Sequence, residues 1–181
     1  MNQKNKIIIL SGKAQSGKNL TANIIKEYCE KNNKKTIIIS YAKYLKDYAK
    51  AITNWNGREK TKPREFLQQL GTEIKNNIDE DILINRIKED IKVYKNYFDT
   101  IVISDARFIN EIEKIKEEFK NAIVIRIEGI ENKLTDKQKQ HITETALDNY
   151  KKFDYTIENK TTKQNLKQQI KKIMEEQKWK K

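Results

Sequence analysis

A seven-residue loop near the start of the chain limits the possible folds more than any other segment. It follows the apolar run Ile7–Leu10, precedes a helical pattern, and has the sequence Gly12-Lys13-Ala14-Gln15-Ser16-Gly17-Lys18. This is the G-x-x-x-x-G-K arrangement of a phosphate-binding loop. Glycines let successive N–H groups point at phosphate oxygens, and the helix N-terminus adds positive potential. We therefore expect the whole loop to bind ATP, with Lys18 between the β- and γ-phosphates.

The rest of the chain alternates short apolar runs with helical patterns. Strands are expected at Ile7–Leu10, Thr36–Ser40, Thr100–Ser104, Ala122–Ile127 and Tyr155–Ile157. This alternation predicts an α/β protein with a P-loop NTPase fold, in which five parallel strands carry helices on both faces. We expect one domain that covers residues 1–181. Ligands of such sheets bind beyond the carboxyl ends of the strands, and every motif described below falls at such an end.

Helix starts can be predicted from capping residues. Pro63 suits the opening of a helix. Asp79 suits the N-cap of the next one, and Thr161 with Gln164 suits the capping box of the last one. Residues 129–147 are polar and nearly without pattern, so we expect them to form a lid, either as a loop or as a mobile helical insertion.

The formal net charge of +12 allows attraction to polyanions. However, the lysines are spread along the chain and interleaved with acidic residues, which favours a solvated surface. No basic run carries the aromatic residues expected of a single-strand binder. We therefore expect small nucleotides as ligands and no specific nucleic-acid partner.

Two further features bear on location. Cys29 is the only cysteine, so an internal disulfide is excluded and a reducing compartment fits. No apolar run approaches the roughly 18 residues of a membrane span, and the N-terminus lacks a leader pattern. We expect a cytoplasmic protein without a membrane partner, and a homodimer is left open.

The strand expected at Thr100–Ser104 ends in charged residues. Asp105 has the position of a Mg²⁺-orienting carboxylate, acting through water, and the alternative is a cap on the following helix. Arg107 can grip a phosphate with its planar guanidinium, and the alternative is a surface ion pair with Glu111. Asn19 stands where Ser or Thr usually ligates Mg²⁺, so we expect the metal to be held largely through water.

Five segments, in order, resemble the deoxynucleoside monophosphate kinases of bacteriophages and some bacteria. The loop is similar to their G-K-x-x-S-G-K. Arg64 with Leu67–Glu73 is similar to their R-x-x-L-Q-x-x-G-T-E helix, and Asp105–Glu111 resembles their D-x-R-F-x-N-E segment. His141–Glu144 resembles the H-x-S-E of their lid, with Thr for Ser. Phe153–Asn159 matches their F-D-x-x-I-x-N approach to the last helix.

The resemblance implies the reaction ATP + dNMP → ADP + dNDP with Mg²⁺ as cofactor. Lys18, Asp105 and Arg107 would then serve the transfer, and the acceptor would be bound by Arg64, Gln68, Arg107 and Glu111. Asn159 lies in the turn where P-loop kinases commonly hold adenine, and the alternative is a turn-forming residue. His141 and Glu144 would order the lid, with general-base use of His141 as the less favoured reading.

The chain also departs from this pattern. The family often has a lid arginine after Ile127, where this chain has Glu128-Gly129. We expect Lys133, Lys137 or Lys139 to replace it. A tryptophan expected near Ile82–Ile84 is also missing.

Other activities remain as alternatives. Animal-type phosphomevalonate kinases share parts of the pattern, so a phosphomevalonate kinase-like or dephospho-coenzyme A kinase-like enzyme is possible, and a nucleic-acid-binding P-loop ATPase is a further option. A GTP-dependent switch would need the motif N-K-x-D, but the segment at 132–136 has one residue too many and lies in the wrong place.

Overall fold

The fold is known from a computed structural model, which describes residues 5–130 and 140–177. The strands are β1 (Lys6–Ser11), β2 (Thr36–Ile39), β3 (Thr100–Ala106), β4 (Ala122–Gly129) and β5 (Tyr155–Asn159). The helices are α1 (Lys18–Lys31), α2 (Ala42–Thr53), α3 (Arg64–Asn77), α4 (Ile82–Tyr94), α5 (Ile109–Glu118), α7 (Ile142–Thr145) and α8 (Lys163–Glu176), with a short 3₁₀ turn η1 (Glu59–Thr61). Within the described ranges, no helix combines the length and apolar character needed to cross a membrane.

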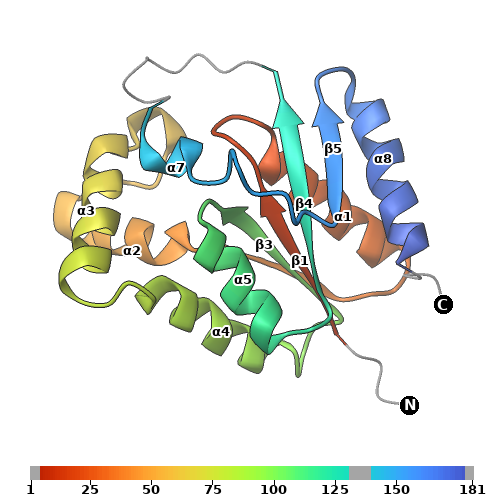
Figure 1. Cartoon of the computed structure of the whole chain (residues 1–181), viewed down its shortest axis with the longest axis horizontal. Helices are drawn as coiled ribbons and strands as arrows, with labels where there is room; N and C mark the ends of the chain where they lie inside the picture. The colour runs from red at the N-terminus through yellow and green to blue at the C-terminus, as the bar shows by residue number, and fades with distance from the viewer. Residues whose placement is uncertain (1–4, 131–139, 178–181) are drawn as a thin grey trace.

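The strands form one parallel sheet in the order β2-β3-β1-β4-β5 (Figure 1). The strand that precedes the phosphate-binding loop is therefore central, with the ends of β3 and β4 on either side of the loop. All five expected strands are present. The α/β fold of the P-loop type is confirmed by this topology together with the structural similarities described below.

Each face of the sheet has its own apolar core, because alternate side chains of a strand point to opposite faces. Ile8 and Leu10 of β1 pack with α1 and α8. Ile7 and Ile9 pack on the other face with α4 and α5 (Figure 1). These four side chains of β1 are at most 3% exposed, so the central strand is a rigid support for the loop that follows it.

Two predicted helix starts are wrong by one or two residues. Asp79 is not the N-cap of α4, since Asp81 occupies that position and the Asp79 carboxylate accepts a hydrogen bond from Asp81 N at 2.9 Å. Asp79 therefore closes a turn ahead of the helix. At α8 the cap is Thr162 rather than Thr161, and its side chain accepts a hydrogen bond from Asn165 N. Pro63 directly precedes α3, as expected.

Only part of the predicted lid is described. Its last residues include α7, which is buried at Glu144. Residues 131–139 lie outside the described residues, and so do Lys133, Lys137 and Lys139.

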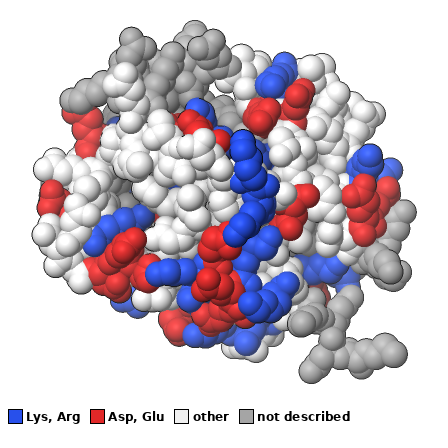
Figure 2. All heavy atoms as spheres, viewed as in Figure 1, with Lys and Arg blue, Asp and Glu red and all other residues white. Residues whose placement is uncertain are grey.

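Surface charges of both signs are interspersed. Figure 2 shows basic side chains next to acidic ones over the displayed face. Ion pairs account for part of this pattern, as at Lys92, whose ammonium lies 3.1 Å from Glu89 and 3.2 Å from Glu118. Such exposed pairs contribute little to stability, but they break up a continuous positive surface.

Candidate functional site

The phosphate-binding loop lies between the end of β1 and the start of α1. Lys18, the first residue of α1, is only 8% exposed, and its ammonium donates to the carbonyls of Gly12 and Lys13, both at 2.7 Å. Burial and the positive charges of Arg107 and Arg126 together lower the pKa of Lys18 to about 7, against the opposing effect of Glu144 and Asp105. The ammonium is thus held inside its own loop, in surroundings where an added anion would favour its charged form.

The ends of β4 and β5 hold the loop from the other side. Gly17 has φ of 97°, and a Cβ there would lie 2.1 Å from the side-chain nitrogen of Asn159. That nitrogen donates to Ser16 O at 3.0 Å. A Cβ at Gly129 would lie 2.5 Å from the Cα of Ser16. These close approaches require glycine, and they fix the loop against the sheet.

Asp105, at the end of β3, caps a helix that is distant in sequence. Its two carboxylate oxygens accept hydrogen bonds from Tyr41 N at 2.8 Å and Ala42 N at 3.0 Å. The alternative that it caps the following helix is wrong, because Phe108 is the N-cap of α5. Asp105 is still close enough to Lys18 for its negative charge to raise the pKa of that residue.

Glu111 fixes the turn between β3 and α5. It is 3% exposed, and one carboxylate oxygen accepts from Arg107 N at 2.7 Å and Phe108 N at 3.1 Å. The other lies 3.3 Å from the ammonium of Lys75 in α3. Burial raises the pKa of Glu111. The hydroxyl of Tyr41 donates to Glu111 O at 2.7 Å, which ties the same turn to the start of α2.

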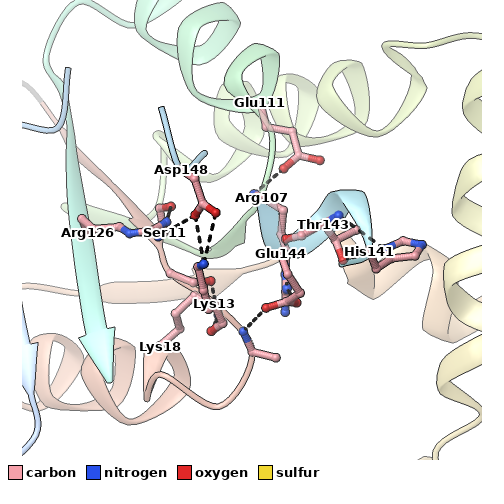
Figure 3. Close-up of polar contacts among 12 residues, drawn as sticks. Ser11, Lys13, Lys18, Arg107, Glu111, Arg126, His141, Thr143, Glu144 and Asp148 are labelled. Carbon is pink, nitrogen blue, oxygen red and sulfur yellow. Dashed lines mark hydrogen bonds and ion pairs between the residues drawn. The ribbon is translucent and has the colours of Figure 1, made fainter. Parts of the chain in front are cut away.

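The Arg107 side chain forms an ion pair, but its partner is not Glu111, which was the alternative expected from the sequence. Its guanidinium forms an ion pair with Glu144 and donates to Thr143 O at 3.3 Å. The second oxygen of Glu144 accepts a hydrogen bond from Ala14 N at 2.6 Å. The buried carboxylate of Glu144 thus lies between the phosphate-binding loop and Arg107 (Figure 3).

His141 takes part in local structure. It is the N-cap of α7, and its Nδ1 accepts a hydrogen bond from Thr143 N at 3.3 Å. The ring therefore helps to set the orientation of the short helix that carries Glu144, which fits the ordering role expected for it.

Arg126 and Asp148 also lie at the site, and the sequence patterns did not single them out. Arg126 of β4 is paired with Ser11 of β1, directly before the loop. Asp148 lies between two cations, 3.1 Å from the ammonium of Lys13 and 3.9 Å from the guanidinium of Arg126 (Figure 3). A charged residue within the apolar run Ala122–Ile127 was the one available signal for Arg126.

The other predicted site residues lie on the first turns of two helices. Arg64 is exposed at the start of α3, and Gln68 is half-buried one turn later. Asn19 is exposed on the first turn of α1. The buried hydroxyls of Ser16 and Thr21 have no hydrogen-bond partner among the described residues. In the same part of the chain, no group of three or more His, Cys, Asp or Glu side chains is arranged to hold a metal ion.

Comparison with known proteins gives one family and a shared fold. The model of the deoxynucleotide monophosphate kinase family matches residues 28–170. This match begins after the phosphate-binding loop, so the two signals are independent of each other. No individual curated protein matches the chain in sequence.

The similar solved structures support the fold. The APS kinase of Mycobacterium tuberculosis in complex with AMPPNP and APS has a TM-score of 0.52 at 10% identity, covering 95% of this chain and 96% of that one. A sugar kinase from a Janibacter species, unliganded, has a TM-score of 0.54 at 10% identity, covering 94% and 93%. At this identity, the likeness concerns the arrangement of the elements.

Proposed function

Because the chain belongs to the deoxynucleotide monophosphate kinase family, we propose that it transfers the γ-phosphate of ATP to a deoxynucleoside monophosphate. Membership makes it a nucleotide-type kinase. The choice of ATP as donor and of a deoxynucleoside monophosphate as acceptor is our proposal, and the geometry around Arg107 supports it.

The observation that carries this proposal is the place of the Glu144 carboxylate. One of its oxygens contacts Ala14 N in the loop, and the other contacts the guanidinium of Arg107. A phosphate is an anion of similar size that prefers the same donors. We infer that a substrate phosphate takes the place of this carboxylate, so that it touches the donor loop and the acceptor arginine together.

The remaining roles follow from this assignment. Residues 12–18 bind the donor phosphates, and Lys18 leaves the loop carbonyls for a phosphate oxygen. Arg107 binds the acceptor phosphate, while Glu111 holds the turn in which Arg107 lies. Arg64 and Gln68 on α3 contribute to acceptor binding. The side chain of Asn159 donates to Ser16 O, and its contact with the adenine of ATP remains a prediction.

The residues present fit a Mg²⁺ ion that is held mainly by phosphates and water. Both oxygens of Asp105 already accept backbone hydrogen bonds, so a water-mediated contact suits this carboxylate better than direct ligation. Asn19 is exposed at the start of α1, and its amide oxygen would contribute to holding a hydrated ion. When bound with ATP, Mg²⁺ supplies charge neutralisation between the β- and γ-phosphates.

The protein groups contribute alignment and positive charge. The acceptor oxygen of a monophosphate is already anionic, so its attack needs little proton abstraction. We therefore assign His141 the positioning role that its N-cap contact supports, rather than that of a base. Lys18 and Arg107 would stabilise the charge that spreads over the transferred group.

A coupled assay of ADP release across possible acceptors tests the proposal. We expect turnover with at least one deoxynucleoside monophosphate and weaker turnover with ribonucleoside monophosphates, phosphomevalonate and dephospho-coenzyme A. If phosphomevalonate or dephospho-coenzyme A gives the highest kcat/KM, the proposed acceptor is wrong. ATP hydrolysis that depends on DNA or RNA at physiological salt, without transfer to any acceptor, would identify a nucleic-acid ATPase instead.

A further inference from the structure

The Arg126 guanidinium is largely buried but poorly paired. Its side chain is 14% exposed, and its polar contacts are a 3.4 Å hydrogen bond to Ser11 Oγ and a 3.9 Å approach to Asp148. It also lies 5.5 Å from the ring centroid of Phe153. Both polar distances are long for a charged group with five N–H donors.

A buried cation with weak partners is costly, and an anion that binds beside it would offset this cost. Arg107 gives the contrast within the same site. It is 25% exposed and has a close carboxylate partner in Glu144. Arg126 is less exposed, and its carboxylate partner among the described residues is the more distant Asp148, which lies closer to Lys13.

The position of Arg126 indicates what the partner is. Arg126 pairs in register with Ser11, directly before the phosphate-binding loop. Its charge is close enough to Lys18 to lower the pKa of that residue. Arg107 follows β3, and Arg126 lies in β4. These two strands flank β1 on opposite sides, and the two arginines lie on either side of Lys18 (Figure 3).

We propose that Arg126 is a donor-site ligand that binds the terminal phosphates of the nucleoside triphosphate, opposite Arg107. Asp148 partly compensates the charge of Arg126, and a bound phosphate group would replace it by accepting hydrogen bonds from two N–H groups of the guanidinium. This inference rests on the proposed function only for the nature of the donor.

Binding of AMPPNP, measured by titration calorimetry, tests this role without catalysis. We expect Arg126→Ala to weaken AMPPNP binding at least about tenfold, as for loss of one charge-assisted bidentate contact. Arg126→Lys should recover part of the loss, because an ammonium lacks the planar fork. The matched control is Arg86→Ala, an exposed arginine of α4, which should bind AMPPNP as the wild type does.

Asp148→Asn gives a second test in the opposite direction. Removing this carboxylate leaves Arg126 and Lys13 available, so AMPPNP should bind several-fold more tightly. This variant keeps the test valid if Arg126→Ala fails to fold. The KM for the acceptor should change less than about threefold in Arg126→Ala, which separates it from Arg107→Ala.

The outcomes separate this inference from the proposed function. Unchanged AMPPNP affinity in folded Arg126→Ala, with only a lower Tm, would show that Arg126 merely joins β4 to Phe153. Weaker AMPPNP binding in this variant, together with a wild-type protein that phosphorylates no nucleotide, would leave the Arg126 site intact and overturn the proposed acceptor. A wild-type protein that binds no AMPPNP would overturn both.

Discussion

The carboxyl ends of β3 and β4 flank the same loop, but they differ in how completely their polar groups are paired. At the end of β3, Asp105 and Glu111 accept close backbone hydrogen bonds, and Arg107 has a close carboxylate partner. At the end of β4, the polar contacts of Arg126 with the described residues are long. The first end is held together by close contacts within the protein, whereas we propose that a phosphate supplies the close partner of Arg126 at the second. Substitutions should therefore affect stability at β3 and ligand binding at β4.

Lys18 lies between the ends of β3 and β4, and its substitution has the largest expected effect. Lys18→Ala should abolish phosphoryl transfer while leaving the fold intact, because the ammonium is the proposed contact to both donor phosphates. Single-turnover assays measure the transfer, and circular dichroism checks the fold. Lys31→Ala, at the other end of α1, is the control. Wild-type turnover in a folded Lys18→Ala protein would remove the phosphate-binding role of the loop.

Glu111 tests the stability side of the comparison. Glu111→Ala leaves the ammonium of Lys75 and two buried N–H groups without their partner, so the free energy of unfolding should fall by about 3 kcal/mol. Chemical denaturation measures this loss. Glu117→Ala, at an exposed position of the same helix, should cost less than about 0.5 kcal/mol. The comparison fails if Arg126→Ala destabilises the protein more than Glu111→Ala does.

Substitution of Arg107 tests whether the residues at the end of β3 also bind the acceptor. Arg107→Ala should lower kcat/KM for the acceptor at least about tenfold and change AMPPNP affinity much less, because a bidentate contact to the acceptor phosphate is lost. Arg107→Lys should recover only part of the activity. Steady-state kinetics with each substrate varied in turn separate the two effects. Unchanged acceptor kinetics in a folded variant would withdraw Arg107 from the acceptor site.

Glu144→Gln should strengthen nucleotide binding. The substitution removes the negative charge that now contacts Ala14 N and Arg107, so a phosphate meets weaker competition. We expect AMPPNP to bind about threefold to tenfold more tightly, as measured by titration calorimetry. Glu158→Gln, at an exposed position of β5, is the matched control. Weaker AMPPNP binding by Glu144→Gln would mean that Glu144 assists the nucleotide rather than competing with it.

The lowered pKa of Lys18 predicts a proton uptake on nucleotide binding. In the empty protein this pKa is about 7, and bound phosphate should raise it. At about pH 8.5, AMPPNP binding should then take up nearly one proton, and at about pH 6 almost none. Calorimetry in two buffers of different ionisation enthalpy measures the uptake. Equal binding heats in both buffers at the higher pH would contradict the prediction.

The lowered pKa of Lys18 also makes the stability of the fold depend on pH. Between about pH 7 and the ordinary lysine value of 10.5, the unfolded chain binds a proton at Lys18 that the folded chain has released. The contribution of Lys18 to the free energy of unfolding therefore rises with pH over this window. This rise with pH should be absent in Lys18→Ala.

Much of the fold could be predicted because its signals are local. Runs rich in Ile mark the buried strands, and the placement of the loop after Ile7–Leu10 fixes the fold type. Helix starts were predicted less reliably. Asp79 and Thr161 each lie within two residues of the observed N-cap, and the local chain geometry decides which residue caps the helix.

The contacts of the site could not be predicted, because they join residues distant in sequence. Glu144 contacts Ala14 across 130 residues, and Asp105 contacts Tyr41 across 64. Both carboxylates were predicted as site residues, but no spacing in the sequence gives their partners. Arg126 was missed for a related reason, since its role follows from strand order, which places β4 next to β1.

The cap formed by Asp105 on α2 gives the site a mechanical connection to α3. Leu45 of α2 would lie only 3.1 Å from a Cβ placed on Gly71 of α3, so the two helices have almost no free space between them. If Asp105 moved on nucleotide binding, the start of α2 would therefore move with it, and α3 would have to adjust. Since α3 carries Arg64 and Gln68, such a movement would connect the donor side of the site to the residues proposed for the acceptor.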